Sequence, residues 1–124
     1  MATRVLLCDD HRIFREGLRT LLEKNPGLSV VGEAGDGPGA VKKVQELAPD
    51  IVLMDLKMPG LDGDEVLRMI GELNPTPKVI FVTAYDDGGK TKARLLNLGA
   101  FACLDKPISS LKDLEETINK AAQK

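Results

Sequence analysis

Ile51-Val52-Leu53-Met54-Asp55 is the stretch that decides the fold of this chain of 124 residues. Four apolar residues run directly into a carboxylate, with Pro49 before the run and Pro59-Gly60 after it. An apolar run of this length, bounded by turn formers, is typical of a strand buried on both faces of a parallel sheet. Ligands of such sheets bind beyond the carboxyl ends of the strands, where Asp55 stands. Taken alone, Asp55 would be better explained as a cap of the following loop or helix.

Composition limits the class of protein and its partners. The length suits one domain, which we expect to span residues 1–124 and to bury a substantial core. A net charge of −2 and an aromatic content of 3% offer neither a basic surface nor a stacking platform for nucleic acid. No apolar run approaches the roughly 20 residues of a membrane span, and the start does not resemble a signal peptide. We therefore expect a cytoplasmic protein without a nucleic-acid or membrane partner.

Apolar runs alternate with amphipathic stretches along the whole chain. This pattern predicts strands at 4–8, 28–34, 51–54, 79–83 and 101–104, and helices at 13–22, 40–48, 64–73, 90–98 and from 111 onward. The cluster Gly35-Asp36-Gly37-Pro38-Gly39 is interpreted as a turn. Five strand–helix units with right-handed crossovers give an α/β fold, a doubly wound five-stranded parallel sheet with helices on both faces.

Four of the five predicted strands lead to a reactive residue at the same edge of the sheet. Asp9 and Asp10 follow the first strand, Asp55 the third and Lys106 the fifth, while Thr83 ends the fourth. The flavodoxin-like strand order 2-1-3-4-5 places the first and third strands side by side, so that the acids after them meet. We therefore predict this order, in which the second strand contributes nothing to the set.

Three clustered carboxylates repel one another, and their joint ionisation is favoured only if a cation neutralises them. Mg²⁺ fits this set because it takes oxygen ligands and combines one or two carboxylates with a phosphate. A nearby lysine offsets further negative charge, and a hydroxyl with loop amides can hold phosphoryl oxygens. An aspartate in such surroundings is a candidate covalent phosphate acceptor.

Over essentially its full length the chain resembles the receiver domain of two-component response regulators. The matching motifs are Cys8-Asp9-Asp10-His11, Leu53-Met54-Asp55-Leu56-Lys57-Met58-Pro59-Gly60-Leu61-Asp62-Gly63, Phe81-Val82-Thr83-Ala84 and Asp105-Lys106-Pro107. Each motif is weak alone, but together, in this order and spacing, they are highly specific. The first motif, the pattern of the first helix and Val31-Gly32-Glu33-Ala34 look like the LuxR-type subgroup.

The resemblance implies that a histidine kinase phosphorylates Asp55 and that Mg²⁺ is the cofactor. Asp10 and Asp55 would ligate Mg²⁺ directly, together with the backbone carbonyl of Lys57, while Asp9 would act through a water. Thr83 and the neighbouring Ala84 would hold phosphoryl oxygens, and Lys106 would pair with the phosphate. A cis peptide would precede Pro107.

The resemblance also implies an output surface on the fourth helix, the fifth strand and the fifth helix. Through it the domain would contact a downstream domain or partner, or a second copy after phosphorylation. The chain departs from the family at Cys103, where an aromatic residue is usual, so Phe101 or Tyr85 would have to substitute for it. Phe101, two residues earlier, would point to the same face of the strand.

Other residues receive simpler interpretations. His11, the only histidine, is given no chemical role. Cys8 and Cys103 are interpreted as buried small hydrophobes. With two strands between theirs, their Cα atoms should lie on the order of 14 Å apart, too far for a disulfide.

Other functions compatible with the motifs remain open. A phosphohydrolase of the aspartate-nucleophile class would need a second Asp two residues after Asp55, where this chain has Lys57. A pure interaction module would not need the intact acid, threonine and lysine set. The chain is expected to be either a stand-alone receiver in a phosphorelay or part of a longer transcription regulator with a C-terminal DNA-binding domain. Long side chains at Lys57 and Tyr85 would shield the phosphoryl group and lengthen its lifetime.

Overall fold

A computed structural model describes residues 2–60, 62–84, 87–106 and 111–123, in which strands and helices alternate strictly. The strands are β1 (Thr3–Cys8), β2 (Leu28–Ala34), β3 (Ile51–Met54), β4 (Lys78–Thr83) and β5 (Ala102–Asp105); the helices are α1 (Arg12–Glu23), α2 (Gly37–Leu47), α3 (Gly63–Gly71), α4 (Lys90–Asn97) and α5 (Leu111–Ala122). Neighbouring strands all pair in parallel, in the order β2-β1-β3-β4-β5. The predicted fold class and strand order are therefore confirmed.

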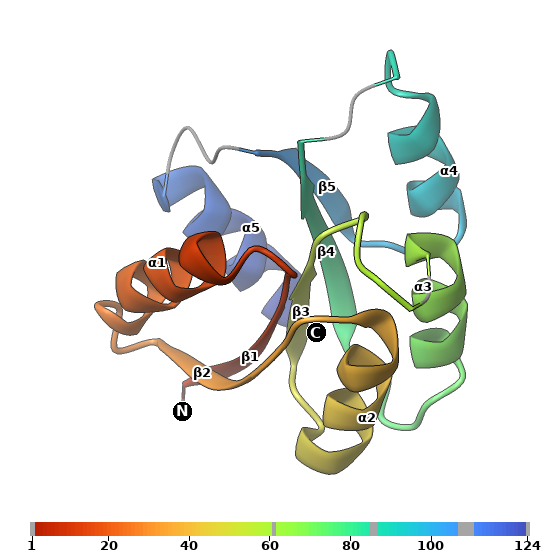
Figure 1. Ribbon diagram of the computed structural model, residues 1–124. Helices are drawn as coiled ribbons and strands as arrows, with labels where there is room; N and C mark the ends of the chain where they lie inside the picture. The colour runs from red at the N-terminus through yellow and green to blue at the C-terminus, as the bar shows by residue number, and fades with distance from the viewer. Residues whose placement is uncertain (1, 61, 85–86, 107–110, 124) are drawn as a thin grey trace.

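Helices cover both faces of the sheet (Figure 1), with α1 and α5 on one side and α2, α3 and α4 on the other. Side chains of β1 alternate between the two layers: Val5 and Leu7 pack with α1 and α5, whereas Leu6 and Cys8 pack with α2 and α3. Both faces of the central strands must therefore be apolar, which is why β1, β3 and β4 are continuous apolar runs in the sequence. Within the described ranges, no helix has the length and apolar character needed to cross a membrane.

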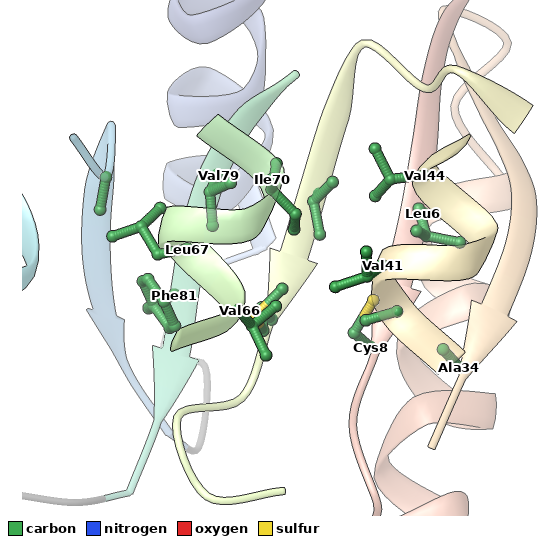
Figure 2. Packing of buried hydrophobic residues seen from close by; sticks show 14 of the residues in the cluster. Leu6, Cys8, Ala34, Val41, Val44, Val66, Leu67, Ile70, Val79 and Phe81 are labelled. Atoms are coloured by element: carbon green, nitrogen blue, oxygen red, sulfur yellow. The ribbon is translucent and has the colours of Figure 1, made fainter. Parts of the chain in front are cut away.

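The core on the α2–α3 side contains one row of residues that crosses the sheet. Cys8 pairs with Met54, Met54 with Phe81, and Phe81 with Cys103. Figure 2 shows Cys8 and Phe81 within the packed cluster, and Cys103 packs against it while half-buried. Three strand spacings of ~4.8 Å separate the two cysteines, against the less than ~7 Å that a disulfide needs, and both are free thiols. Burial raises the pKa of the Cys8 thiol to about 12, so this thiol is neutral at physiological pH.

The predicted start of α2 was wrong, because the helix already begins at Gly37, inside the segment interpreted as a turn. The Asp36 side chain caps the helix by accepting a hydrogen bond from the Gly39 amide at 2.6 Å. Pro38 is compatible with a first turn, where its missing N–H is not needed. Glycine and proline therefore build the start of a helix here.

The predicted start of β5 was also wrong. The strand begins at Ala102, and Phe101 lies before it with 39% of its surface exposed, although its amide still donates to the Val79 carbonyl at 2.8 Å. Cys103 instead packs against the core. Phe101 therefore lies outside β5 and is more exposed than the half-buried Cys103, and its substitution for the usual aromatic residue stays a prediction. The predictions for Tyr85 and for the peptide before Pro107 lie outside the described residues.

Gly63, the first residue of α3, tests how tightly this helix packs on the sheet. An added Cβ would lie 2.5 Å from Leu56 Cδ1 and 3.2 Å from Phe81 Cε1, both in buried residues. Gly63→Ala should therefore lower the free energy of unfolding by roughly 1–3 kcal/mol, because the core would be overpacked. Urea unfolding followed by circular dichroism measures this.

Gly71 in the same helix provides the control, since a Cβ there meets no atom within 4 Å. Gly71→Ala should be neutral or stabilise by up to about 1 kcal/mol through helix propensity. Equal stability of the two variants would contradict the packing described here.

Candidate functional site

Two buried carboxylates lie at the carboxyl edge of the sheet, one residue beyond β1 and β3. The amide of Asp9 donates to the Ala34 carbonyl at 3.0 Å, and that of Asp55 donates to the Cys8 carbonyl at 2.9 Å. These bonds extend the β1–β2 and β1–β3 ladders, so the backbone of the sheet fixes both aspartates. Asp9 is 5% exposed and Asp55 is 4% exposed. The predicted meeting of the acids after β1 and β3 is confirmed.

Lys106 supplies the opposite charge from the end of β5. Its amide donates to the Thr83 carbonyl at 3.0 Å, which ties the segment after β5 to the end of β4. Its Nζ lies 2.7 Å from Asp9 Oδ2 and 3.4 Å from Asp55 Oδ2. The ammonium also stands 4.2 Å from the centroid of the Phe14 ring, a favourable cation–π position. One lysine therefore links α1 to the ends of three strands.

His11 and Asp10 complete the cluster on its open side. His11 Nδ1 lies 3.2 Å from Asp9 Oδ1, 3.3 Å from Asp10 Oδ1 and 3.7 Å from Asp55 Oδ2. One potential ligand atom from each of these four residues lies within 4.8 Å of the others. Neighbouring ligands of a small divalent ion, at bonds of about 2.1 Å, stand about 3 Å apart, so this donor set can hold a metal ion.

Sequence reasoning gave His11 no chemical role, yet its ring faces three carboxylates. The available signal was its place directly after the acid pair, in the turn from β1 to α1. Its amide donates to Asp9 Oδ1 at 2.8 Å, which folds the turn back over the cluster.

A groove of about 490 Å³ opens beside Asp55. Its lining contains Lys57, Thr83 and Ala84, three residues that the sequence assigned to the site. Thr83 is buried at the end of β4, whereas Lys57 and Ala84 are exposed on the loops that follow β3 and β4. The Lys57 amide donates to Asp55 Oδ1 over 3.4 Å. The remaining lining residues are His11, Ile13, Phe14 and Lys106. Five of the predicted site residues thus line one groove, while Asp9 and Asp10 lie next to it in the cluster with His11 and Asp55.

The second strand, which the prediction left out of the site, reaches it through an arginine. Arg15 of α1 donates from Nη1 to the backbone carbonyl of Asp9 and from Nε to Glu33 Oε1 at 2.7 Å. Arg19, one turn later, donates to Glu33 Oε2 at 2.6 Å. Burial opposes the charge of Glu33, but hydrogen bonds from Arg19 and Arg15 outweigh it and lower the pKa of this carboxyl. The sequence signal was a glutamate near the end of β2 with two arginines one helical turn apart.

The arrangement agrees with a known family. Residues 5–119 match the response regulator receiver domain. The chain belongs to the response regulator receiver domain family. Phosphorylation on an aspartate is general behaviour of receiver domains, and the resemblance found in the sequence is thereby confirmed.

Curated relatives of this receiver domain are longer proteins. The chain is 39% identical over 120 residues to the transcriptional regulatory protein LiaR of Bacillus subtilis, covering 97% of this chain and 56% of LiaR. It is 35% identical over 123 residues to a protein-glutamate methylesterase/protein-glutamine glutaminase of Alkalilimnicola ehrlichii, covering 99% of this chain and 32% of that protein. The receiver domain thus spans about half of one relative and a third of the other.

Solved receiver structures share the whole fold. The response regulator domain of Thermotoga maritima CheB superposes with a TM-score of 0.89 at 35% identity, covering 98% of this chain and 97% of that one. A LuxR-family two-component response regulator from Aurantimonas sp. SI85-9A1 gives a TM-score of 0.87 at 33% identity, covering 98% and 86%. The likeness to the LuxR-type subgroup predicted from the sequence is therefore present in the structure as well.

The contact between Lys106 and the two buried aspartates can be tested by stability. Lys106→Met leaves two carboxylates buried without their cation, so the free energy of unfolding at neutral pH should fall by ~3 kcal/mol. Adding Asp9→Asn removes one of the two charges and should recover part of that loss, which a double-mutant cycle with urea unfolding measures.

Lys42→Met is the matched control, because Lys42 pairs with Glu46 on the exposed face of α2. Its cost should stay below about 1 kcal/mol. Additive effects of Lys106→Met and Asp9→Asn would contradict the coupling.

Proposed function

We propose that this receiver domain accepts a phosphoryl group on Asp55 from a histidine kinase, with Mg²⁺ as cofactor, and passes the resulting change to an output partner. The observation that carries the proposal is the Asp55 carboxylate: it is buried, it lies 3.4 Å from the Lys106 ammonium, and it borders a groove next to a set of metal ligands. A carboxylate so placed is oriented before the donor arrives, and positioned charge is most of what phosphoryl transfer requires.

In the transfer, a carboxylate oxygen of Asp55 attacks the phosphorus of a phosphohistidine. The P–O bond to Asp55 forms while the P–N bond of the donor breaks, and the histidine nitrogen leaves with the bonding pair and takes up a proton. Lys106 and the Thr83 hydroxyl, with the Ala84 amide, bind phosphoryl oxygens as charge develops on them. Asp10, Asp55 and the Lys57 carbonyl would hold Mg²⁺, with Asp9 acting through a water, and the ion would supply positive charge beside the phosphoryl oxygens.

The output surface is the part of α4, β5 and α5 that faces solvent. Three apolar residues are exposed in α4 and in the connection from α4 to β5: Leu96 at 47%, Leu98 at 36% and Phe101 at 39%. Exposed apolar residues grouped along neighbouring elements favour a protein contact. We infer that a DNA-binding domain, as in a LuxR-type transcription regulator, or a second receiver docks there. The domain itself is then a cytoplasmic signalling module of residues 1–124 rather than an enzyme.

The assignment of Asp55 and of Mg²⁺ can be tested together. Incubation with a small acyl phosphate donor and Mg²⁺, followed by intact-mass measurement, should add one phosphoryl group to the wild type. Asp55→Asn, which is nearly isosteric, should abolish the addition while circular dichroism stays unchanged, and chelation of the metal should abolish it in the wild type.

Other results of this experiment would select another function. Full labelling of Asp55→Asn moves the acceptor elsewhere. Rapid consumption of the donor without a stable adduct favours a phosphohydrolase. If no phosphoryl group is added, an interaction module is the remaining function. If the wild type is phosphorylated without metal, Mg²⁺ has no part in the mechanism.

Lys57 and Tyr85 provide a test of the phosphoryl lifetime. Lys57 is exposed and lines the groove beside Asp55, where its side chain would impede an attacking water. Lys57→Asn/Tyr85→Ala should therefore hydrolyse the aspartyl phosphate several-fold faster or more, each tenfold being ~1.4 kcal/mol of barrier. Loss of phosphate is followed by intact mass in Mg²⁺ at constant pH, with Lys42→Asn as a remote control. A rate at or below that of the wild type would rule out shielding.

A further inference from the structure

We propose that Arg15, anchored by Glu33, is a positioning residue that fixes the Asp9–Asp10 peptide and thereby prepares the acid pair to bind a divalent cation. The inference rests on the proposed function, since it concerns the same Mg²⁺ site. It assigns a role to β2, the strand that none of the predicted site residues ends or follows. The two residues are called the Arg15–Glu33 clamp below.

The clamp uses two donors of one rigid group. The guanidinium of Arg15 is planar, with its N–H donors in a fixed fork. Nε donates to Glu33 Oε1 at 2.7 Å, and Nη1 donates to the Asp9 carbonyl. The side chains of Arg15 and Glu33 are only 18% and 22% exposed, so water competes weakly for these contacts. Because Glu33 fixes one side of the guanidinium, the other side can hold the Asp9 carbonyl in one direction.

Both backbone groups of Asp9 are thereby tied to the end of β2. Its amide is bonded to the Ala34 carbonyl at 3.0 Å, and its carbonyl is bonded through Arg15 to Glu33. The peptide between Asp9 and Asp10 is planar, so fixing its carbonyl also fixes the direction of the next Cα. That Cα belongs to Asp10, whose carboxylate is the proposed direct ligand. The clamp therefore orients the Asp10 carboxylate without contacting it.

Electrostatics alone would give Arg15 the opposite effect. A positive guanidinium near a cation site repels the cation, so its removal should strengthen binding if charge were all that mattered. A positioning role predicts weaker binding instead. Outer partners that orient metal ligands typically contribute 10–100-fold to metal affinity. The sign of the change on removing Arg15 therefore separates the two roles.

Arg19 is the matched control. It donates to the same Glu33 carboxylate at 2.6 Å from the same helix. Among the residues that the structure describes, its other partner is Glu23, at 3.3 Å, and not the backbone of Asp9. Arg15→Gln and Arg19→Gln each remove one positive charge and one ion pair with Glu33. Only Arg15→Gln releases the Asp9 carbonyl.

The experiment measures the dissociation constant for Mg²⁺ by isothermal titration calorimetry on wild type, Arg15→Gln and Arg19→Gln. It is run near neutral pH, where the lowered pKa of Glu33 keeps this carboxylate charged. Arg15→Gln should weaken binding about tenfold, and Arg19→Gln should stay within about twofold of the wild type. Arg15→Lys keeps the positive charge but loses the forked N–H donors, so this variant should also bind Mg²⁺ more weakly than the wild type.

A second readout needs no metal. The backbone amide resonance of Asp10 should shift and broaden in ¹H–¹⁵N spectra of Arg15→Gln, because the Asp9–Asp10 peptide is released, and should stay in place in Arg19→Gln. Urea unfolding reports the stability lost by each variant and so separates a general loosening from the local one.

The outcomes distinguish the clamp from the site itself. If the wild type binds Mg²⁺ and is labelled on Asp55, but Arg15→Gln binds Mg²⁺ as tightly or more tightly, the clamp is overturned and the proposed function stands. Equal weakening by Arg15→Gln and Arg19→Gln also overturns it, since the effect then follows from the ion pairs. If the wild type does not bind Mg²⁺, both proposals fall.

Discussion

The ammonium of Lys106 between the carboxylates of Asp9 and Asp55 is the interaction on which the site depends. Asp9 and Lys106 are 97 residues apart in the chain and meet at 2.7 Å. Burying three charges costs desolvation energy that their attraction only partly returns, so such groups are weak evidence for stability and better evidence for function. Apolar burial in the rest of the sheet offsets this cost, since Ile51 and Val52 of β3 and Leu6 of β1 are fully buried.

Much of this arrangement could be predicted because one constraint, the parallel sheet, acts on the whole chain. Two-sided burial makes β1, β3 and β4 continuous apolar runs, and parallel pairing brings their carboxyl ends to one edge. The acids after β1 and β3 then specify the strand order, because only neighbouring strands let them meet. Asp9, Asp55 and Lys106 can be located in this way from the sequence alone.

Features that depend on a single local contact escaped prediction. The cap that starts α2 at Gly37 depends on the Asp36 side chain, in a segment whose composition is that of a turn. The exposure of Phe101 depends on which residue begins β5, and a short apolar run in the sequence does not define that residue. The Arg15–Glu33 contact joins α1 to an edge strand through two residues that are 18 positions apart, and neither residue type is unusual at its place. Hydrophobic periodicity contains no information on such contacts.

The grouping of acids at one edge of the sheet has a consequence for the field around the whole molecule. The chain has 19 acidic and 17 basic residues; without Asp9, Asp10, Asp55 and Lys106 it has 16 of each. The net charge of −2 therefore equals the charge of the site, while the rest of the molecule is formally neutral. The formal net negative charge of the domain therefore lies at its own groove. Cations are drawn there, most strongly at low salt, where the Debye length reaches ~30 Å at 0.01 M.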